Sequence, residues 1–347
     1  MLCTLYIVHT AYYKYHILYI LYTMFYIIRA VYVLYIIRDM YYMYTAYYTY
    51  IKVVLCMDVY VRELSNTQLP QYLPTIVRHA SRRACGHLMI SVGNILKGTQ
   101  FHDKLATDDA IGMFLSDEVF GQNRDVGYLA SVAYCMCQLI TSELCVSMLI
   151  AGGLIDLTMK HLLDTIDQRA LRSDQQRRDQ ATEAHEHLWA IIVNLAQNKR
   201  YDTHIIIHTK TLVALIVKEV REDITVRCTL MDSIALYVYN LSAREDFEQL
   251  LAVEEIDELI ECIRIIMIKI RSYQSLLLSA FINILVAVPA MRSLALTEEW
   301  MNSLRVERNV LPHLQVMYVK YACVLNIYSS EEACYPKLMT LGAHAMM

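Results

Sequence analysis

The sequence contains little glycine and proline and has no strong excess of either charge. Its 347 residues include only 9 Gly and 5 Pro, which argues against an all-β protein built on Gly- and Pro-rich turns. Lys and Arg number 31 against 35 Asp and Glu, a formal net charge of −4, so no basic balance points to nucleic acid. Hydrophobic residues make up 56% of the chain. That share excludes a disordered chain and predicts a sizeable buried core.

Short motifs for catalysis and metal binding are also missing. The chain has no GxxxxGK[ST], GxGxxG, HExxH or GxSxG. Its 10 Cys form no CxxC pair, and most lie in apolar helical patterns, typical of buried small hydrophobes in a reducing compartment. His204 and His208 would share a helix face, but no third ligand has local spacing. We therefore expect no enzyme, metal, cofactor or small-molecule substrate; an enzyme on a helical scaffold is the rival hypothesis.

Residues 1–56 differ in composition from the rest of the chain. They hold 15 of the 27 Tyr and are apolar and of low complexity. Their only Lys, Arg, Asp and Glu are Lys14, Arg29, Arg38, Asp39 and Lys52, with a sum of +3. Residues 57–347 therefore carry a formal charge of −7 and read as a mildly acidic body.

This Tyr-rich head has several interpretations. Residues 15–37 are 23 residues with one charge, Arg29, so a membrane helix is conceivable, although a central Arg costs about 2.5–3.5 kcal/mol. A secretory signal is disfavoured because no basic start or cleavage site is visible. An amphipathic surface helix is a further alternative. We favour a mis-assigned start, with Met57 opening a normal-looking sequence.

The body from residue 76 onward shows helical periodicity and resembles itself. Each segment has an apolar helix with a polar residue near its end, a short linker and a second apolar helix. We name these polar residues the anchor residues: Asn94, Gln138, Asn194, Asn240, Asn283 and Asn326. Their spacings are 44, 56, 46, 43 and 43, and the long interval contains a polar insertion, residues 164–187, expected to be an exposed loop or a helix extension.

The residues beside each anchor residue repeat as well. The position two before is apolar in every case, and the position after is aliphatic. These two positions are three apart and so share one helix face. A period of about 43 is typical of armadillo (ARM) or HEAT repeats.

These units resemble ARM repeats. Asn194-Leu195-Ala196 and Asn240-Leu241-Ser242 match the Asn-Leu-Ser helix end of that family, and 151–155, Ala-Gly-Gly-Leu-Ile, matches its second element once. HEAT repeats are the structural rival, and the helix-end Asn favours ARM. The resemblance implies an all-α, right-handed α-solenoid (an ARM/HEAT superhelix) of about six helical repeats over residues 76–347, after the head at 1–56 and a connecting segment at 57–75.

The resemblance also implies a function. In ARM proteins the helix-end Asn lines a concave groove and hydrogen-bonds a bound peptide's backbone, for which an amide carries both donor and acceptor. The six anchor residues are therefore the candidate groove residues, binding an extended peptide or a partner helix. The alternative is that they only satisfy backbone groups at helix ends.

The expected activity is protein–protein scaffolding or adaptor work in the cytoplasm, with the nucleus possible. A nuclear-transport adaptor of the importin-α class is a rival function. Proteins of that class have a Trp four residues before the Asn, whereas the corresponding residues here are Ile90, Leu236 and Ser279. The negative body leaves an acidic groove possible, which mildly favours a basic ligand. A membrane-tethered scaffold depends wholly on residues 1–56, and a cytoskeletal or ciliary docking scaffold is a further alternative.

The native N-terminus tests the interpretation of the Tyr-rich head. We expect intact-mass measurement and N-terminal peptide sequencing of the native protein to give a chain beginning at Met57. A chain beginning at Met1 would contradict this and make membrane fractionation the next measurement.

Overall fold

The structure is a computed structural model that describes residues 69–97, 101–121, 125–169, 175–222, 228–269, 274–300 and 315–340. The chain divides into two units, Met1–Met57 and Asp58–Met347, and every described residue belongs to the second. The Tyr-rich head and the proposed start at Met57 lie outside the described residues.

The described residues form helices joined by short connections and contain no strand, which confirms an all-α fold. The first helices are α4 (Leu69–His79), α5 (Arg82–Leu96), α6 (His102–Leu105), α7 (Asp108–Leu115), the π-helical turn η1 (Asp117–Gly121), α8 (Val126–Leu139), α9 (Glu143–Ala151), α10 (Leu154–Arg169) and α11 (Gln175–Gln197). The later ones are α12 (Asp202–Ile206), α13 (Thr209–Glu222), α14 (Cys228–Ser242), α15 (Phe247–Leu250), α16 (Val253–Lys269), α17 (Gln274–Ala287), α18 (Ala290–Ala295), α20 (Gln315–Ser329), the 3₁₀ turn η5 (Glu332–Cys334) and α21 (Tyr335–Thr340).

Local sequence signals set several helix ends. Ser81 and Thr107 accept hydrogen bonds from the backbone N–H groups of Ala84 and Ala110, three residues on, and so cap α5 and α7. Asp125 caps α8 in the same way. Between α9 and α10, Gly153 adopts φ 91°, a left-handed conformation that glycine takes without a side-chain penalty. The chain can therefore turn sharply from one helix into the next.

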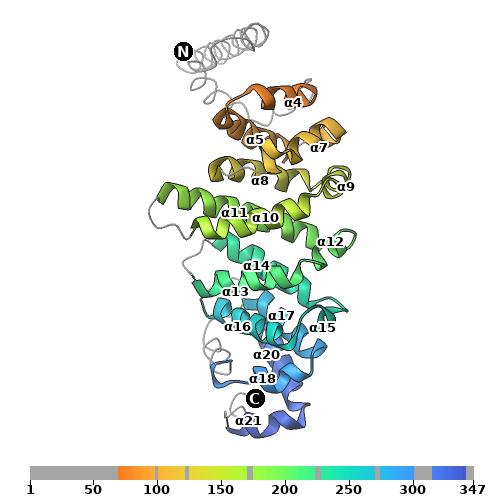
Figure 1. The fold of residues 1–347 in the computed structure, drawn as a ribbon. Helices are drawn as coiled ribbons and strands as arrows, with labels where there is room; N and C mark the ends of the chain where they lie inside the picture. Colours follow the sequence, from red (N-terminus) through yellow and green to blue (C-terminus); the bar gives the residue numbers. More distant parts are fainter. Residues whose placement is uncertain are drawn as a thin grey trace, which may run out of the picture. The chain divides into compact units, whose positions relative to one another are not determined.

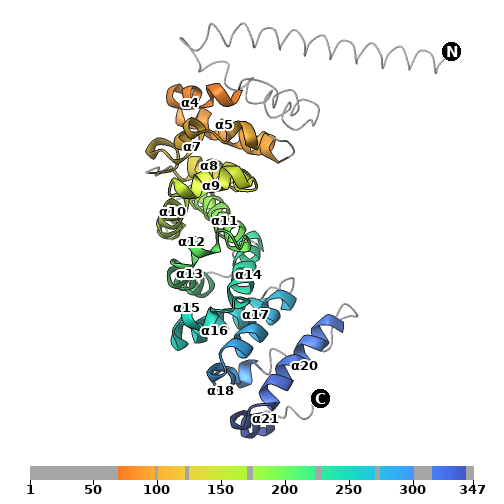
Figure 2. The same ribbon diagram turned by 90° about the vertical axis from the view of Figure 1, so that its right-hand side faces the viewer.

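One helix of each repeating segment packs against its counterpart in the next. We call α5, α8, α11, α14, α17 and α20 the anchor helices, and each packs on the following one. A second set lies beside them: α10 packs on α11, α16 packs on α17, and α13 packs on α16. Figure 1 shows the helices following one another along the chain, and Figure 2 shows the anchor helices on one side, with α10, α13 and α16 on the other.

The apolar positions beside the anchor residues form the contacts between anchor helices. The residues two before the anchors are all buried: Val92, Met136, Ile192, Val238, Phe281 and Val324. Those directly after are buried too, except for the half-exposed Ile327. The two positions flanking each anchor residue therefore face the core, as expected for residues three apart on a helix.

The polar insertion at 164–187 continues α10 and α11, with residues 170–174 outside the described part. Its sequence is polar, yet it places a fully buried histidine, His185, in the core. The Nδ1 atom of His185 lies 2.8 Å from the Thr165 hydroxyl of α10, and its Nε2 atom lies 2.9 Å from a carboxylate oxygen of Glu219 on α13. The indole nitrogen of Trp189 lies 3.1 Å from the same Nε2 atom, which either accepts from this N–H or donates to Glu219. This buried polar network joins three helices.

The predicted boundary at residue 76 falls inside a helix, because α4 spans Leu69–His79. Proline does not prevent this start: Pro70 lies in the first turn, where its missing N–H would have no partner within the helix.

Side chains also connect neighbouring segments along the edge formed by the short helices. Arg244 pairs with Asp202 of the preceding segment, and Arg292 pairs with Glu331 of the following one at 3.1 Å. The hydroxyls of Ser147 and Tyr201 lie 2.9 Å apart. Polar contacts at this edge thus accompany the apolar packing of the anchor helices.

Among the described helices, none is by itself long and apolar enough to cross a membrane. One bent pair, Glu143–Ala151 with Leu154–Ile166, reaches the required length and composition across a 74° bend. Cys145, Leu149 and Leu154 of this pair are fully buried in the fold.

Phe281 tests the anchor-helix packing. Its ring is fully buried on α17 and stacks on Trp300 with centroids 3.9 Å apart. We expect Phe281→Ala to lower the free energy of unfolding by about 3–5 kcal/mol, because it removes a large ring from a packed core. Urea denaturation followed by circular dichroism measures this. The control Ile207→Ala, at a side chain that is 77% exposed, should change stability by about 0.5 kcal/mol or less; equal effects would contradict the packing described.

Candidate functional site

The anchor residues all lie near the C-terminal ends of the anchor helices, but their surroundings differ. Asn194 and Asn326 are exposed. The other four are half-buried: Asn94, Gln138, Asn240 and Asn283. We call the accessible side of the anchor helices that carries these residues the anchor face.

Two consecutive anchor residues show how amides sit between neighbouring anchor helices. The Nδ2 atom of Asn283 on α17 donates a 3.3 Å hydrogen bond to the Ser242 hydroxyl on α14. The Nδ2 atom of Asn240 has no hydrogen-bond partner among the described residues. Asn283 therefore contributes to contact between helices, whereas the Nδ2 donor of Asn240 is buried and unpaired among the described residues.

The anchor face has a cluster of interacting side chains, contributed by α5, α8 and α11, around Tyr134. Its hydroxyl donates a 2.7 Å hydrogen bond to Oδ1 of Asn94. The Lys97 ammonium lies 5.2 Å from the ring centroid, within cation–π range. The His187 ring lies 5.4 Å from the Tyr134 ring, tilted by 56°. An amide, a cation and two rings thus meet at one place.

Gly93 makes room for this cluster. A Cβ atom at position 93 would lie 2.7 Å from Cε1 of Tyr134 and 3.3 Å from the Cα of Cys135. Any side chain here would therefore push the Tyr134 ring away from α5. The glycine next to Asn94 is required by the close approach of α8.

Burial and a neighbouring cation keep the His187 ring neutral. Burial lowers its pKa to about 4, and the positive charge of Lys97 adds to the shift because a second cation nearby disfavours protonation. The cluster therefore carries one positive charge, that of Lys97, at neutral pH.

Sequence reasoning named Asn94 and Gln138 but missed Tyr134. The signal was available: Tyr134 lies four residues before Gln138, one helical turn away, where an aromatic side chain shares the anchor face. Ile90 holds the corresponding position in α5 and is partly exposed, 39%. The importin-α pattern specifies Trp at four residues before the anchor residue, and Tyr134 does not match it.

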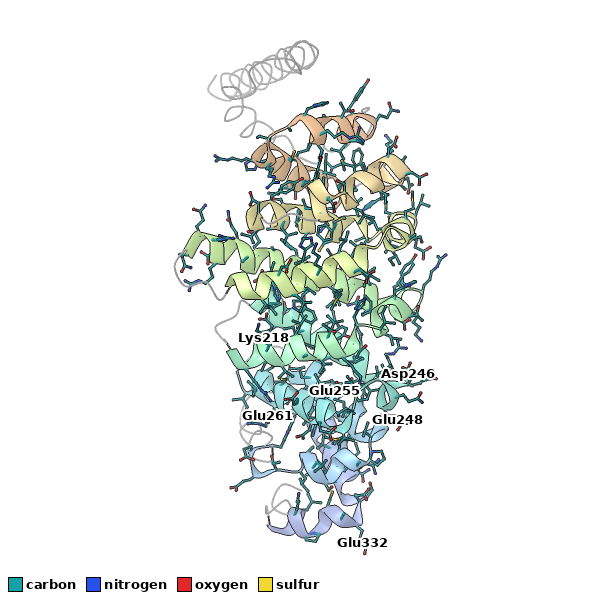
Figure 3. The ribbon with its side chains drawn as sticks, in the orientation of Figure 1. Lys218, Asp246, Glu248, Glu255, Glu261 and Glu332 are labelled. Carbon is teal, nitrogen blue, oxygen red and sulfur yellow. The ribbon has the colours of Figure 1, made fainter. Side chains whose placement is uncertain are left out.

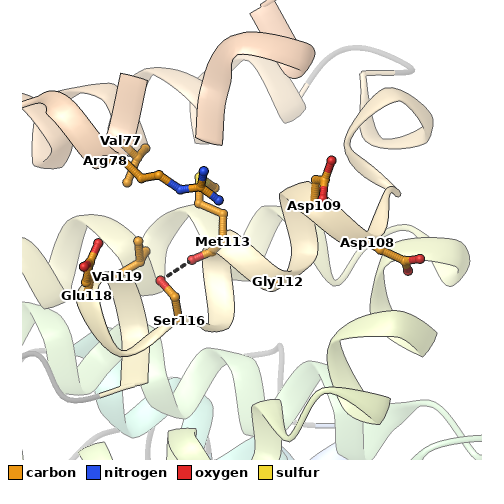
Figure 4. A pocket seen from close by; sticks show the side chains of 9 residues that line it. All are labelled: Val77, Arg78, Asp108, Asp109, Gly112, Met113, Ser116, Glu118 and Val119. Atoms are coloured by element: carbon orange, nitrogen blue, oxygen red, sulfur yellow. Dashed lines mark hydrogen bonds between the residues drawn. The ribbon is translucent and has the colours of Figure 1, made fainter. Parts of the chain in front are cut away.

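A pocket of about 240 Å³ lies away from the anchor face, between α4 and the α7–η1 segment. Arg78 reaches across it toward Met113, and Ser116 donates a 2.7 Å hydrogen bond to the Met113 carbonyl (Figure 4). The charged groups at its wall, Arg78 and Asp109 among them, are exposed. Exposed charges of this kind are solvated, and the lining offers no nucleophile–base pair.

The remaining candidates for chemistry are dispersed or buried. His204 is exposed, and His208 lies 3.4 Å from a carboxylate oxygen of Asp156. No group of three or more His, Cys, Asp or Glu that could hold a metal ion occurs among the described residues. Burial raises the pKa of the Cys137 and Cys262 thiols to about 12, so these thiols stay protonated and weakly nucleophilic.

His187 predicts a pH dependence of stability. Its pKa is about 4 in the fold against 6.5 ordinarily, so the unfolded chain binds the proton first as the pH falls. Its contribution is complete above pH 6.5 and is lost toward pH 4, a change of up to about 3 kcal/mol at about 1.4 kcal/mol per pKa unit. We expect His187→Gln to flatten this part of the stability–pH curve in urea denaturation. His79→Gln, at an exposed position, is the control and should leave the slope unchanged; a wild-type slope in His187→Gln would contradict the assignment.

No family model matches the chain, and no curated protein or solved structure matches it either. The function of this chain is therefore inferred from its own residues and contacts.

Proposed function

We propose that the helices of residues 69–340 form an ARM-type α-solenoid that binds an extended segment of another protein along the anchor face. The role is scaffolding or adaptor work without catalysis. The anchor residues would hydrogen-bond the backbone of the bound segment.

One observation carries this proposal: the six anchor residues fall at the ends of six helices that pack consecutively. The packing brings helices whose anchor residues lie 43 to 56 apart in sequence against one another, and the proposal places these residues along one face. Packed helices lie about 8–10 Å apart. An extended chain advances about 3.3 Å per residue, so one amide would meet roughly every third ligand residue.

The helix lengths support ARM over HEAT units. Four segments begin with a short helix of four to six residues, namely α6, α12, α15 and α18. In the segments of α12 and α15, a longer helix and then an anchor helix follow: α13 and α14 after α12, α16 and α17 after α15. A unit of three helices is the ARM pattern, whereas HEAT units have two, consistent with the resemblance at Asn194-Leu195-Ala196.

The chemistry of the anchor face suits a peptide backbone. Asn194 is exposed, so both donor and acceptor of its amide can reach a ligand. The Nδ2 donor of Asn240 is buried without a hydrogen-bond partner among the described residues, so a ligand carbonyl would reach it only after neighbouring side chains move. The apolar residues flanking these amides are buried in the core, so amides can be replaced without removing core contacts.

The test is the loss of peptide binding when two anchor amides are removed. Dodecapeptides selected from a random displayed library on the full chain are synthesised, and their affinities are measured by fluorescence anisotropy. We expect Asn194→Ala/Asn240→Ala to weaken binding about tenfold or more, since each hydrogen bond contributes about 0.5–1.5 kcal/mol. Thermal unfolding should show that the fold is intact.

The matched control removes two exposed amides from helices that are not anchor helices. Gln71 on α4 and Gln249 on α15 are exposed and absent from the anchor face, so Gln71→Ala/Gln249→Ala should leave the affinity within about twofold. A folded Asn194→Ala/Asn240→Ala variant with wild-type affinity for every selected peptide would contradict the proposal.

A further inference from the structure

The charges of this chain are distributed unevenly between the anchor face and the other helices. Carboxylates gather on α15 and α16 and the turns beside them, at Glu245, Asp246, Glu248, Glu254, Glu255, Asp257, Glu258 and Glu261. Figure 3 shows Asp246, Glu248, Glu255 and Glu261 from this set. The formal charge of −7 over residues 57–347 therefore does not describe the anchor face, and the sequence argument for a basic ligand loses its basis there.

The anchor face begins at α5 and α8 without acidic side chains. Neither α5 nor α8 contains an Asp or Glu. Along one face of α5 and its C-cap, accessible positions follow at spacings of four and three residues: Arg83, His87, Ile90, Asn94 and Lys97. We call Arg83, His87, Asn94 and Lys97, with Tyr134 of α8, the basic end. Acidic side chains on the anchor face start at α11, with the exposed Glu183.

The hydrogen bonds of the basic end leave donors facing outward. Tyr134 donates to Oδ1 of Asn94, which fixes the amide so that its Nδ2 donors remain available. Lys97 is exposed and forms no ion pair with a described carboxylate, and its ammonium lies over the Tyr134 ring. His187 beside them is neutral at pH 7 because its pKa is about 4. A site of amide and ammonium donors is complementary to a carboxylate.

We propose that the basic end binds an acidic side chain, Asp or Glu, of the extended segment, with Lys97 as the counter-charge and Asn94 as the hydrogen-bond donor. The inference rests on the proposed function, since the same segment would continue along the anchor face past Asn194 and Asn240. It adds the chemistry of the bound segment and the location of its acidic part: the part that lies on α5 and α8 is acidic. The carboxylates of α15 and α16 would also repel a strongly acidic ligand from that part of the surface.

The experiment compares peptide selections by charge variants of the full chain. Random dodecapeptides are selected on wild type, Lys97→Glu and the control Lys210→Glu. The control makes the same charge change at an exposed Lys of α13, whose 3.7 Å pair with Glu255 is at the surface. We expect wild type and Lys210→Glu to enrich Asp and Glu. Selection on Lys97→Glu should lose that enrichment.

Affinities of the selected acidic peptides give the quantitative readout. Lys97→Glu should weaken them roughly fivefold or more, and Lys210→Glu by about twofold at most, as expected for removal of a local ion pair. Wild-type affinity should fall as salt rises from about 0.05 to 0.5 M, because salt screens exposed charges. Lys97→Arg should retain most of the affinity, since it keeps the charge.

The outcomes separate this inference from the proposed function. Some peptides could depend on Asn194 and Asn240 but bind Lys97→Glu with wild-type affinity. Such peptides would overturn the basic end and would still support binding along the anchor face. Peptides that depend on Lys97 and not on those two amides would support the basic end and overturn the extended groove. No peptide enriched on the wild-type chain would overturn both.

Discussion

Packing of each anchor helix against the next, so that α8, α11, α14 and α17 lie between two others, is the constraint on which the described fold depends. Met136 on α8 and Ile192 on α11 are fully buried, and α8 and α11 each pack against helices from other segments of the sequence. A lone helix with one apolar face cannot achieve this, so each segment relies on the next for its stability. The same packing fixes which positions remain accessible. The anchor amides stay near the surface because their neighbours in sequence point into the core. These neighbours are the residue two positions before each anchor residue and the residue directly after it.

The part of the fold that periodicity encodes could be predicted from the sequence. An apolar residue two before and one after a recurring Asn defines a buried helix face, and Phe281 and Ile284 around Asn283 show the outcome. The all-α class and the recurring helix follow from this period of 3.6 residues. Short helices such as α12 and α15 carry too few residues for a periodic signal. For that reason the two-helix description of each segment omitted them.

The candidate site and the buried polar network were only partly predictable, because both depend on contacts between distant residues. The sequence offers Asn94 as a helix-end amide, but its bond to Tyr134 spans 40 positions. In the insertion at 164–187, high polarity predicts solvent exposure, yet His185 is fully buried. Its partners Thr165 and Glu219 lie 20 and 34 positions away on other helices. Composition averaged over a segment cannot reveal one residue whose polar atoms have partners on other helices.

The network around His185 has a consequence for how α11 aligns with its neighbours. This helix has 23 residues, and apolar side chains alone would pack nearly as well if it slid along its axis by one turn, about 5.4 Å. Such a slide would bring Ala181 or Trp189 to the position of His185 and leave Thr165 and Glu219 facing a side chain that cannot serve both. Buried polar groups without partners are costly. The polar partners of His185 therefore favour one axial position of α11. That axial position determines where Asn194, on the same helix, lies on the anchor face.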